Sequence, residues 1–233
     1  MVDLRPEYKK KDIRSFVIRK GRMTEGQKKA FDLWWPHYGL SLFDGEINPL
    51  EVFGRDAPLV LEVGFGMGDS LLAMAKAEPD KDFIGIEVHS PGVGRLISQA
   101  GTSDVKNLRV YMADAVDVLS DCVASESLER FQLFFPDPWH KKKHHKRRIV
   151  QNAFVALVRQ KLLDGGVLHM ATDWEAYADH MMEVMHLSQG YENAASEYHF
   201  AEAPSYRPLT KFEARGKRLG HGVWDIIFSK KYK

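Results

Sequence analysis

Residues 59–69 read LVLEVGFGMGD, an apolar run that ends in a loop with three glycines. The run predicts a buried strand over 59–65, and residues 69–77 predict a short helix that ends before Pro79. Glycines between a strand and a helix allow a ligand to approach the backbone closely. This stretch therefore predicts the first strand, loop and helix of an α/β fold, with a ligand site at the loop.

The same alternation continues along the chain. Ser90-Pro91 predicts a helix N-terminus, with Ser90 as the cap and proline at the first helical position. The pattern indicates a doubly wound, mostly parallel sheet of about seven strands, whose ligands bind at the carboxyl ends of the strands. The further segments are strands over 82–88, 108–114, 131–135, 167–172 and 223–231, and helices over 90–100, 147–163 and 174–187.

A different pattern precedes residue 59. Residues 1–22 are polar and basic and predict a flexible arm. Thr24 and Gln27 form a capping box that predicts a helix to about Pro36, and residues 39–58 predict a connecting loop. We expect a basic arm, helix and loop over 1–58 and one α/β domain over 59–233.

Charge is distributed unevenly over the 233 residues, although the formal net charge is only +1. Residues 1–30 hold ten Lys/Arg against four Asp/Glu, residues 51–137 hold seven against fifteen, and residues 138–233 hold sixteen against ten. Basic ends suit a polyanion, whereas the acidic middle suits another ligand. The sequence has no membrane-span pattern and no secretory signal, and its one cysteine, Cys122, excludes an internal disulfide, so we expect a cytoplasmic protein.

The glycine loop favours a cofactor without phosphate. Its pattern is G-x-G-x-G, and Asp69 stands where a dinucleotide fold has its third glycine. A carboxylate at a helix N-terminus would compete with a pyrophosphate. S-adenosylmethionine carries a positive sulfonium and no phosphate, so it suits an acidic pocket. We expect it to bind beside the loop glycines Gly64, Gly66 and Gly68.

Three acids follow or lie within successive strands. Glu87 ends the second strand, where an acid can accept hydrogen bonds from both ribose hydroxyls. Asp114 ends the third strand and could meet the adenine edge, and Glu62 lies beside the loop expected to hold the methionine end. The alternative interpretation is that each is an ordinary exposed carboxylate.

Residues 134–148, FFPDPWHKKKHHKRR, place Asp137 between two prolines and before six Lys/Arg and three His. Together with EVGFGMG, IGIEVH, ATDWEAYA, TKFEARG and the early stretch SFVIRKGRMTEGQ, they resemble the bacterial tRNA (guanine-N7)-methyltransferase family over nearly the whole chain. The resemblance implies the Rossmann-like class I methyltransferase fold, S-adenosylmethionine as cofactor, tRNA as partner, and methylation of the variable-loop guanosine at tRNA position 46.

The resemblance also implies site residues. Glu62, Glu87, Asp114 and Asp137 would contact the cofactor, with Asp137 as the active-site residue. Substrate contacts would come from Lys141, Asp173, Thr210, Lys211, Phe212 and Glu213, and RNA contacts from Lys143, His144, His145, Lys146, Arg147 and Arg148.

Guanine N7 has an available lone pair, so methylation there needs no strong base. Positioning, and a carboxylate that stabilises the developing cation, would supply much of the rate. The prolines restrict the backbone of Asp137 and would hold it for this role, although a solvated turn residue is the alternative. Trp139 could stack on a base or pack within the protein, and Asp173 could instead cap the following helix.

Three other functions compete with tRNA methylation. A methyltransferase of the same fold could act on another RNA, a protein or a small molecule, a nicotinamide dehydrogenase could use the glycine loop, and an RNA-binding protein could keep the fold without catalysis. The basic run alone is also typical of a solvated face. The histidines His140, His144 and His145 lack nearby acids at metal spacing, so we expect no metal site. We expect a monomer or homodimer.

Overall fold

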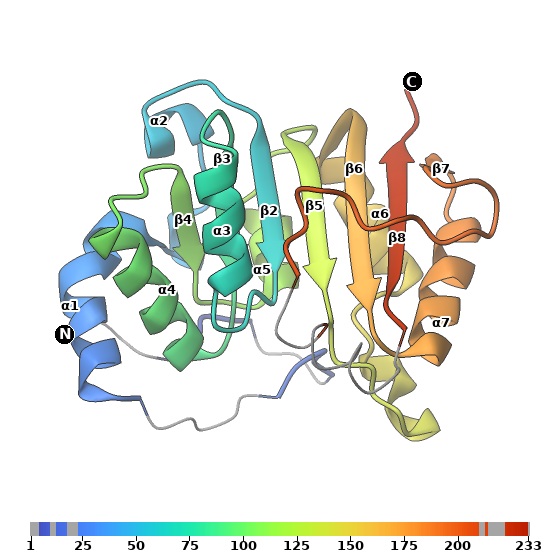
Figure 1. Cartoon of the computed structure of the whole chain (residues 1–233), viewed down its shortest axis with the longest axis horizontal. Helices are drawn as coiled ribbons and strands as arrows, with labels where there is room; N and C mark the ends of the chain where they lie inside the picture. The colour runs from blue at the N-terminus through green and yellow to red at the C-terminus, as the bar shows by residue number, and fades with distance from the viewer. Residues whose placement is uncertain (1–4, 10–12, 18–22, 210–212, 214–221, 233) are drawn as a thin grey trace. The chain divides into compact units, whose positions relative to one another are not determined.

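Strands and helices alternate along most of the chain (Figure 1). The computed structural model describes residues 5–9, 13–17, 23–209, 213 and 222–232. It divides into two units: the first comprises Met1–Lys10 and Ile18–Ala124, and the second Lys11–Val17 and Ser125–Lys233. The boundary expected near residue 58 stays a prediction. Within the described ranges, no helix is long and apolar enough to cross a membrane.

The first unit contains four strands that pair in the order β1-β4-β3-β2, all parallel. Val63 pairs with Ile86, and Ile86 pairs with Tyr111, so the carboxyl ends of β2, β3 and β4 lie side by side. The strands are β1 (Gly39–Leu40), β2 (Leu59–Val63), β3 (Asp82–Ile86) and β4 (Leu108–Tyr111).

Helices cover both faces of these strands, with α3 and α4 in front of them and α5 behind in Figure 1. The predicted capping box is confirmed, because Thr24 Oγ1 accepts from Gln27 N and Gln27 Oε1 accepts from Thr24 N. The helices are α1 (Glu25–Tyr38), η1 (Leu42–Asp44), α2 (Pro49–Phe53), α3 (Asp69–Ala77), α4 (Ser90–Thr102) and α5 (Ala115–Asp121).

The second unit has four strands in the order β5-β6-β8-β7. β5 and β6 are parallel, whereas β8 is antiparallel to both β6 and β7. The fold is therefore α/β and mostly parallel, as predicted, with eight strands instead of about seven. The elements are β5 (Leu128–Phe134), η2 (Lys142–Arg147), α6 (Asn152–Lys161), β6 (Leu162–Thr172), α7 (Glu175–His186), β7 (Tyr191–Asn193) and β8 (Trp224–Lys230).

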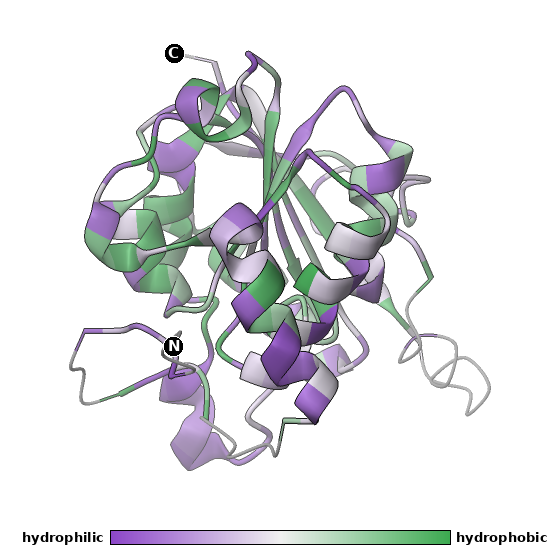
Figure 2. Cartoon of the chain, turned by 90° about the vertical axis from the view of Figure 1, so that its left-hand side faces the viewer, coloured by the Kyte–Doolittle hydropathy of each residue, from purple (hydrophilic) through white to green (hydrophobic). Residues whose placement is uncertain are grey.

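The central strands form the core because helices cover them on both faces. Every residue of β2 and β3 is buried, which explains why these segments are continuous apolar runs. Figure 2 shows hydrophobic residues gathered along the strands and on parts of the helices, with many loops hydrophilic.

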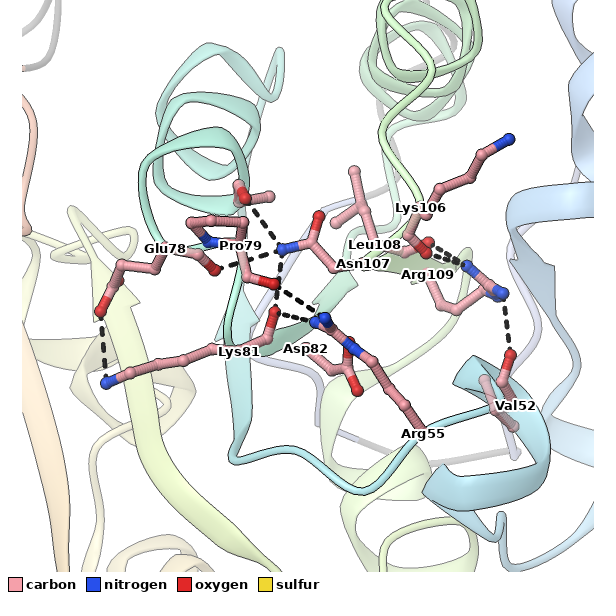
Figure 3. A network of polar contacts seen from close by, with 11 residues as sticks. Val52, Arg55, Glu78, Pro79, Lys81, Asp82, Lys106, Asn107, Leu108 and Arg109 are labelled. Carbon is pink, nitrogen blue, oxygen red and sulfur yellow. Dashed lines mark hydrogen bonds and ion pairs between the residues drawn. The ribbon is translucent and has the colours of Figure 1, made fainter.

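A polar network closes the amino ends of β3 and β4 in the first unit (Figure 3). The Asn107 amide donates to the carbonyls of Ala75 and Lys81 at 2.8 Å each. The Arg55 guanidinium lies 2.7 Å from the buried Asp82 carboxylate and donates to Lys81 O. The network satisfies carbonyls in the last turn of α3 and just beyond it, and it lies at the amino ends of the strands, away from their carboxyl ends.

Several local predictions were wrong. The expected loop over 39–58 contains β1, η1 and α2, whose short lengths give little periodicity. The cap of α4 is His89, because Ser90 already belongs to the helix. The helix expected from residue 147 begins at Asn152, since residues 142–147 form the 3-10 helix η2. The sequence analysis missed α5 and β7.

The expected flexible arm has defined contacts in both of its described segments. Glu7 N donates to Met112 O, and the Glu7 carboxylate accepts from Leu42 N. Lys9 N donates to the Asp117 carboxylate at 2.7 Å. These contacts fix residues 7 and 9 within the first unit, so the interpretation as a flexible arm was wrong there.

Candidate cofactor and nucleic-acid site

The loop after β2 has the backbone that the three glycines predicted. Gly64 and Gly66 adopt positive φ angles of 76° and 59°, and a Cβ at either position would meet no atom within 4 Å. A Cβ at Gly92 would instead collide with the carbonyl oxygen of Gly66. The loop therefore has open space at Gly64 and Gly66, whereas a Cβ at Gly68 would lie only 2.7 Å from the Leu96 side chain. The course of the loop also depends on the absence of a side chain at Gly92 of α4.

Glu87 joins this loop to the end of β3. Its Oε2 accepts from Gly66 N at 2.8 Å, and its Oε1 accepts from Val88 N at 2.7 Å and His89 N at 3.0 Å. Burial raises the pKa of the Glu87 carboxyl, while the three N–H donors favour its charged form. These donors use three of the roughly four acceptor sites of a carboxylate. Two ribose hydroxyls could both donate to Glu87 only if one N–H donor gave way.

Glu62 lies on β2 and Asp114 lies shortly beyond the end of β4, the two strands that flank β3, and both acids are buried. Asp114 Oδ1 accepts from Val116 N at 2.9 Å and so caps α5. Asp114 N donates to Glu7 O, which ties the acid to the N-terminal segment. Glu62 lies within β2, one residue before the strand ends. The three predicted acids thus lie in or just beyond three neighbouring strands of one unit, and they are not ordinary exposed carboxylates.

Asp69 at the start of α3 has a counter-ion. Its Oδ1 lies 2.7 Å from Arg95 of α4 in a half-exposed pair. The pair partly neutralises Asp69, so this residue opposes a phosphate less strongly than the sequence argument assumed. The remaining argument against a phosphate is the set of acids Glu62, Glu87 and Asp114.

These residues fit S-adenosylmethionine. The half-buried carboxylate of Glu87 keeps an acceptor site and lies beside the open backbone of Gly64 and Gly66, which suits a ribose. The acidic surroundings suit a sulfonium or an amino group. The first unit therefore supplies what an adenosine cofactor with a positive charge requires.

In the second unit, predicted substrate residues follow the carboxyl ends of β5 and β6. Phe135 N donates to Ala171 O at 2.8 Å, which joins the two strand ends. The segments beyond them also touch, since the His140 ring packs edge-on against Trp174 with centroids 4.2 Å apart. Asp137 and Asp173, which lie in these two segments, are both exposed.

Asp173 does not cap α7. The N-cap is Trp174, whose N–H donates to Thr172 Oγ1 at 3.2 Å. The alternative role as a helix cap was wrong, and the Asp173 carboxylate is exposed for a ligand.

Trp139 and Arg147 hold the N-terminal segment 13–17. Trp139 Nε1 donates to Ser15 O at 3.1 Å, and Arg147 donates to Arg14 O and Phe16 O at 3.0 Å each. The Arg147 guanidinium also lies 3.9 Å from the centre of the Trp139 ring. We call these contacts the arm clasp. They show that Trp139 packs within the protein.

The basic run divides into two groups. Lys141, Lys143 and Lys146 are exposed, as a phosphate-binding surface requires. Arg148 is buried, donates to Pro138 O at 2.9 Å and lies over the Tyr177 ring. Burial lowers the pKa of Arg148, yet it stays protonated because guanidinium pKa values lie so high.

His144 and His145 are half-buried between these two groups. Burial and the neighbouring lysines and arginine lower the pKa of His144, so its ring is mostly neutral near pH 7. A neutral ring contributes a hydrogen bond to RNA instead of a charge.

Of the predicted substrate segment 210–213, Thr210, Lys211 and Phe212 lie outside the described residues. Glu213 is buried, and its Oε2 lies 2.6 Å from Arg207 NH1. Arg207 also contacts Asp225 of β8, with Nε 2.7 Å from Oδ1. Sequence reasoning missed this cluster. Its signal was a charged residue, Asp225, directly before the apolar run 226–228 of β8.

The sequence predicts no metal site at the histidines of the basic run. Among the residues that the structure describes, no group of three or more His, Cys, Asp or Glu could hold a metal ion.

Comparisons with known proteins agree with this geometry. A family model described as "Putative methyltransferase" matches residues 56–226. A tRNA (guanine-N(7)-)-methyltransferase of Saccharophagus degradans is 74% identical, and the match covers 97% of this chain and 99% of that protein. A relative with the same name from Alcanivorax borkumensis is 61% identical, with 94% of this chain and 92% of that protein covered.

The solved structure of the 16S rRNA methyltransferase KamB has the same fold, with a TM-score of 0.58. It is 13% identical, and the match covers 78% of this chain and 92% of that one. This likeness places the fold among the methyltransferases. The relatives go further, because they match nearly the whole chain at high identity. The chain therefore belongs to the tRNA (guanine-N(7)-)-methyltransferase family.

Proposed function

We propose that this protein transfers a methyl group from S-adenosylmethionine to N7 of the variable-loop guanosine at position 46 of tRNA. The observation that carries this proposal is the 74% identity to a tRNA (guanine-N(7)-)-methyltransferase over 97% of the chain. The carboxylates of Glu62, Glu87 and Asp114, in or just beyond three neighbouring strands, support it. A dehydrogenase or a non-catalytic RNA-binding protein has no comparable support.

Each predicted cofactor residue would contact a different part of S-adenosylmethionine. Glu87 would accept a ribose hydroxyl, and Asp114 would meet the adenine edge with an oxygen that does not cap α5. Glu62 and the backbone at Gly64, Gly66 and Gly68 would hold the methionine end. The cofactor supplies an activated methyl group on its positive sulfonium.

Asp137 would provide the negative charge for the chemical step. Guanine N7 attacks with its own lone pair, so no proton has to leave first. Positive charge then grows on the purine ring, and an aligned carboxylate stabilises it. Pro136 and Pro138 restrict the backbone on both sides of Asp137. Arg148 holds Pro138 O, which adds a tertiary restraint to this turn.

The tRNA would be bound by the exposed part of the second unit. Lys143 and Lys146 would contact phosphates, Lys141 and Asp173 would contact the substrate nucleoside, and His144 and His145 would add hydrogen bonds. RNA contacts by Arg147 and Arg148 remain predictions, since both guanidinium groups bind protein carbonyls here. We propose that the protein works in the cytoplasm as a monomer or homodimer.

One experiment tests the proposed function. Unmodified tRNA is incubated with the protein and radiolabelled S-adenosylmethionine, then digested to nucleosides and separated. We expect label in N7-methylguanosine only, and none from a transcript with adenosine at position 46. Label in another nucleoside, or in protein, would favour the alternative of a same-fold methyltransferase with a different substrate.

A further inference from the structure

The turn after β5 carries Asp137 on a backbone that needs support. Phe135 and Trp139, which lie on either side of Asp137, both have left-handed backbone angles, with φ of 52° and 47°. Such angles strain a residue that has a side chain, and they persist only where the surrounding structure holds them. Before Asp137, Phe135 N donates to Ala171 O of β6 and holds the turn. The part of the turn after Asp137 requires a hold of its own.

Arg148 supplies a hold directly at this backbone. Its Nε donates to the carbonyl oxygen of Pro138, the residue after Asp137, at 2.9 Å. Its NH2 lies 3.2 Å from His145 Nε2, and its guanidinium lies 4.8 Å from the centre of the Tyr177 ring. A planar guanidinium with an acceptor at two of its nitrogens and a ring against it has a fixed direction as well as a fixed position.

Tyr177 of α7 gives the guanidinium a rigid support. Its side chain is fully buried, and its ring packs against His180 with centroids 5.8 Å apart. His180 Nε2 lies 3.0 Å from Val150 O, two residues beyond Arg148. Burial raises the pKa of the Tyr177 hydroxyl, and the Asp137 carboxylate adds to the rise. The support therefore lies within electrostatic range of the carboxylate on the turn.

Arg148 is poorly placed to bind a phosphate. It is only 5% exposed, whereas Lys143 and Lys146, shortly before it in the chain, are exposed. To reach a phosphate, the guanidinium would have to leave Pro138 O and the Tyr177 ring. The carbonyl would then lose its donor, which is unfavourable for a buried or half-buried polar group.

We propose that Arg148 is a positioning residue for methyl transfer and that it acts through Asp137. The guanidinium fixes Pro138 O, and this bond sets the backbone that carries the Asp137 carboxylate. Tyr177 supports the guanidinium from α7, and Arg148 itself contacts neither guanine nor phosphate. This inference rests on the proposed function, in which Asp137 stabilises the charge that grows on guanine.

The first test is a double-mutant cycle of Arg148→Lys with Asp137→Asn, measured as the single-turnover rate of methyl transfer with saturating tRNA and S-adenosylmethionine. Arg148→Lys keeps the charge but loses the planar fork, so alone it should lower the rate about tenfold. In the Asp137→Asn background it should lower the rate less than about threefold, because the carboxylate that it positions is already gone. Equal losses in both backgrounds would show that Arg148 acts by another route, and the proposal would fail.

Arg148→Gln separates positioning from phosphate binding. A phosphate contact depends on charge, so it would largely survive in Arg148→Lys and be lost in Arg148→Gln. Positioning depends on the shape of the side chain, so both variants should lose rate while tRNA affinity and its salt dependence stay as in wild type. A weaker affinity and a flatter salt slope in Arg148→Gln would assign Arg148 to RNA and overturn the proposal. The cycle with Asp137→Asn is run with both variants, so the test stands if one of them does not fold.

Arg130→Lys is the matched control for general destabilisation. Arg130, the third residue of β5, is also 5% exposed, and its guanidinium lies 3.9 Å from the centre of the Tyr206 ring. Arg130→Lys should lower Tm about as much as Arg148→Lys does, yet keep the rate of methyl transfer within about threefold of wild type. If Arg130→Lys shows the same rate loss and the same coupling to Asp137, the effect of Arg148 is destabilisation alone and the inference is wrong.

Hydrogen exchange tests the hold without any activity. The peptide 135–141 reports the amides around Asp137, and its exchange should be faster in Arg148→Lys than in wild type or Arg130→Lys. If wild type methylates no tRNA, the proposed function fails while this measurement still tests the bond to Pro138 O. Equal exchange rates in all three proteins would show that Arg148 does not hold the turn, and would refute the positioning role.

Discussion

Glu87 accepts three backbone N–H groups and lies between the glycine loop and the end of β3. Its replacement removes the acceptor for a ribose hydroxyl and releases the loop at Gly66. An unpaired buried polar group costs about 1–3 kcal/mol, so Glu87→Ala should weaken S-adenosylmethionine binding by about tenfold or more. Calorimetric titration measures this, with Glu51→Ala, a change in α2, as the control. Unchanged affinity would remove Glu87 from the cofactor site.

Asp137 is exposed beyond the C-terminal end of β5, and we propose that its carboxylate contacts the ligand. Asp137→Asn keeps the size of the side chain and removes its charge. We expect kcat to fall by about 10²-fold, as for the loss of other aligned electrostatic groups, with a smaller change in KM for tRNA. Single-turnover assays with saturating cofactor measure the step. A rate within about threefold of wild type would mean that the charge takes no part in methyl transfer.

At the scale of elements, the strands and long helices were predictable because burial sets their patterns. α3 spans the predicted residues 69–77, and the capping box begins α1. Asp114 shows where this reasoning stops. It was interpreted as a ligand at a strand end, and the helix that it caps was missed. Helix caps and ligand-binding residues are often both aspartates, so the sequence does not distinguish the two roles. Only the tertiary structure shows whether one carboxylate caps a helix, faces a ligand site, or does both.

The candidate site shows the same limit. Acids at strand ends could be found in the sequence because parallel strands bring their carboxyl ends together. The partners of Arg147 and Arg207 could not, since a guanidinium that binds a phosphate and one that binds a distant carbonyl or carboxylate look alike in sequence. The basic run was therefore treated as one surface, although the structure buries Arg148 and exposes Lys143 and Lys146.

Within η2, Lys143 and Lys146 are exposed, whereas Arg147 binds backbone carbonyls. We therefore expect replacement of the lysines and replacement of Arg147 to change the salt dependence of tRNA binding differently. Lys143→Ala with Lys146→Ala should flatten the dependence of tRNA affinity on salt, because each lost phosphate contact releases fewer counterions. Arg147→Ala should instead release the arm clasp and affect the salt slope less. Filter-binding titrations at several salt concentrations test this, with cofactor affinity as the control. Equal slopes in wild type and the double lysine variant would assign those lysines to a solvated face.

The network around Asn107 predicts a stability effect remote from the site. Asn107→Ala removes the side-chain donor to Ala75 O and one of the two side-chain donors to Lys81 O, which keeps its bond from Arg55. The loss should lower the free energy of unfolding by about 2–3 kcal/mol, with cofactor affinity unchanged. Urea denaturation measures the first and calorimetry the second. A change below about 0.5 kcal/mol would mean that the backbone compensates for the lost amide.

At the scale of the whole molecule, His169 links stability to pH. Burial lowers its pKa, although Asp225 opposes the shift. In the unfolded chain the imidazole titrates near pH 6.5, so between that value and the lower folded pKa the unfolded state binds more protons. Stability should therefore fall as the pH drops below about 6.5 and be regained above it.

Thermal melts between about pH 7.5 and pH 5.5 test this linkage, and His169→Gln should lose less Tm over the range. His180→Gln measures the contribution of a second histidine whose pKa burial also lowers, and we expect an effect of the same sign. If His169→Gln follows wild type at every pH, another group carries the acid sensitivity.

The arm clasp has a consequence for how the sequence can evolve. Trp139 and Arg147 donate hydrogen bonds to the backbone carbonyl oxygens of residues 14–16. Every amino acid carries this oxygen. Drift at positions 14–16 therefore leaves the bonds intact, whereas a change at 139 or 147 removes them. Selection on this contact therefore acts on Trp139 and Arg147. Residues 14–16 can acquire new side chains and still keep their backbone bonds to these two residues.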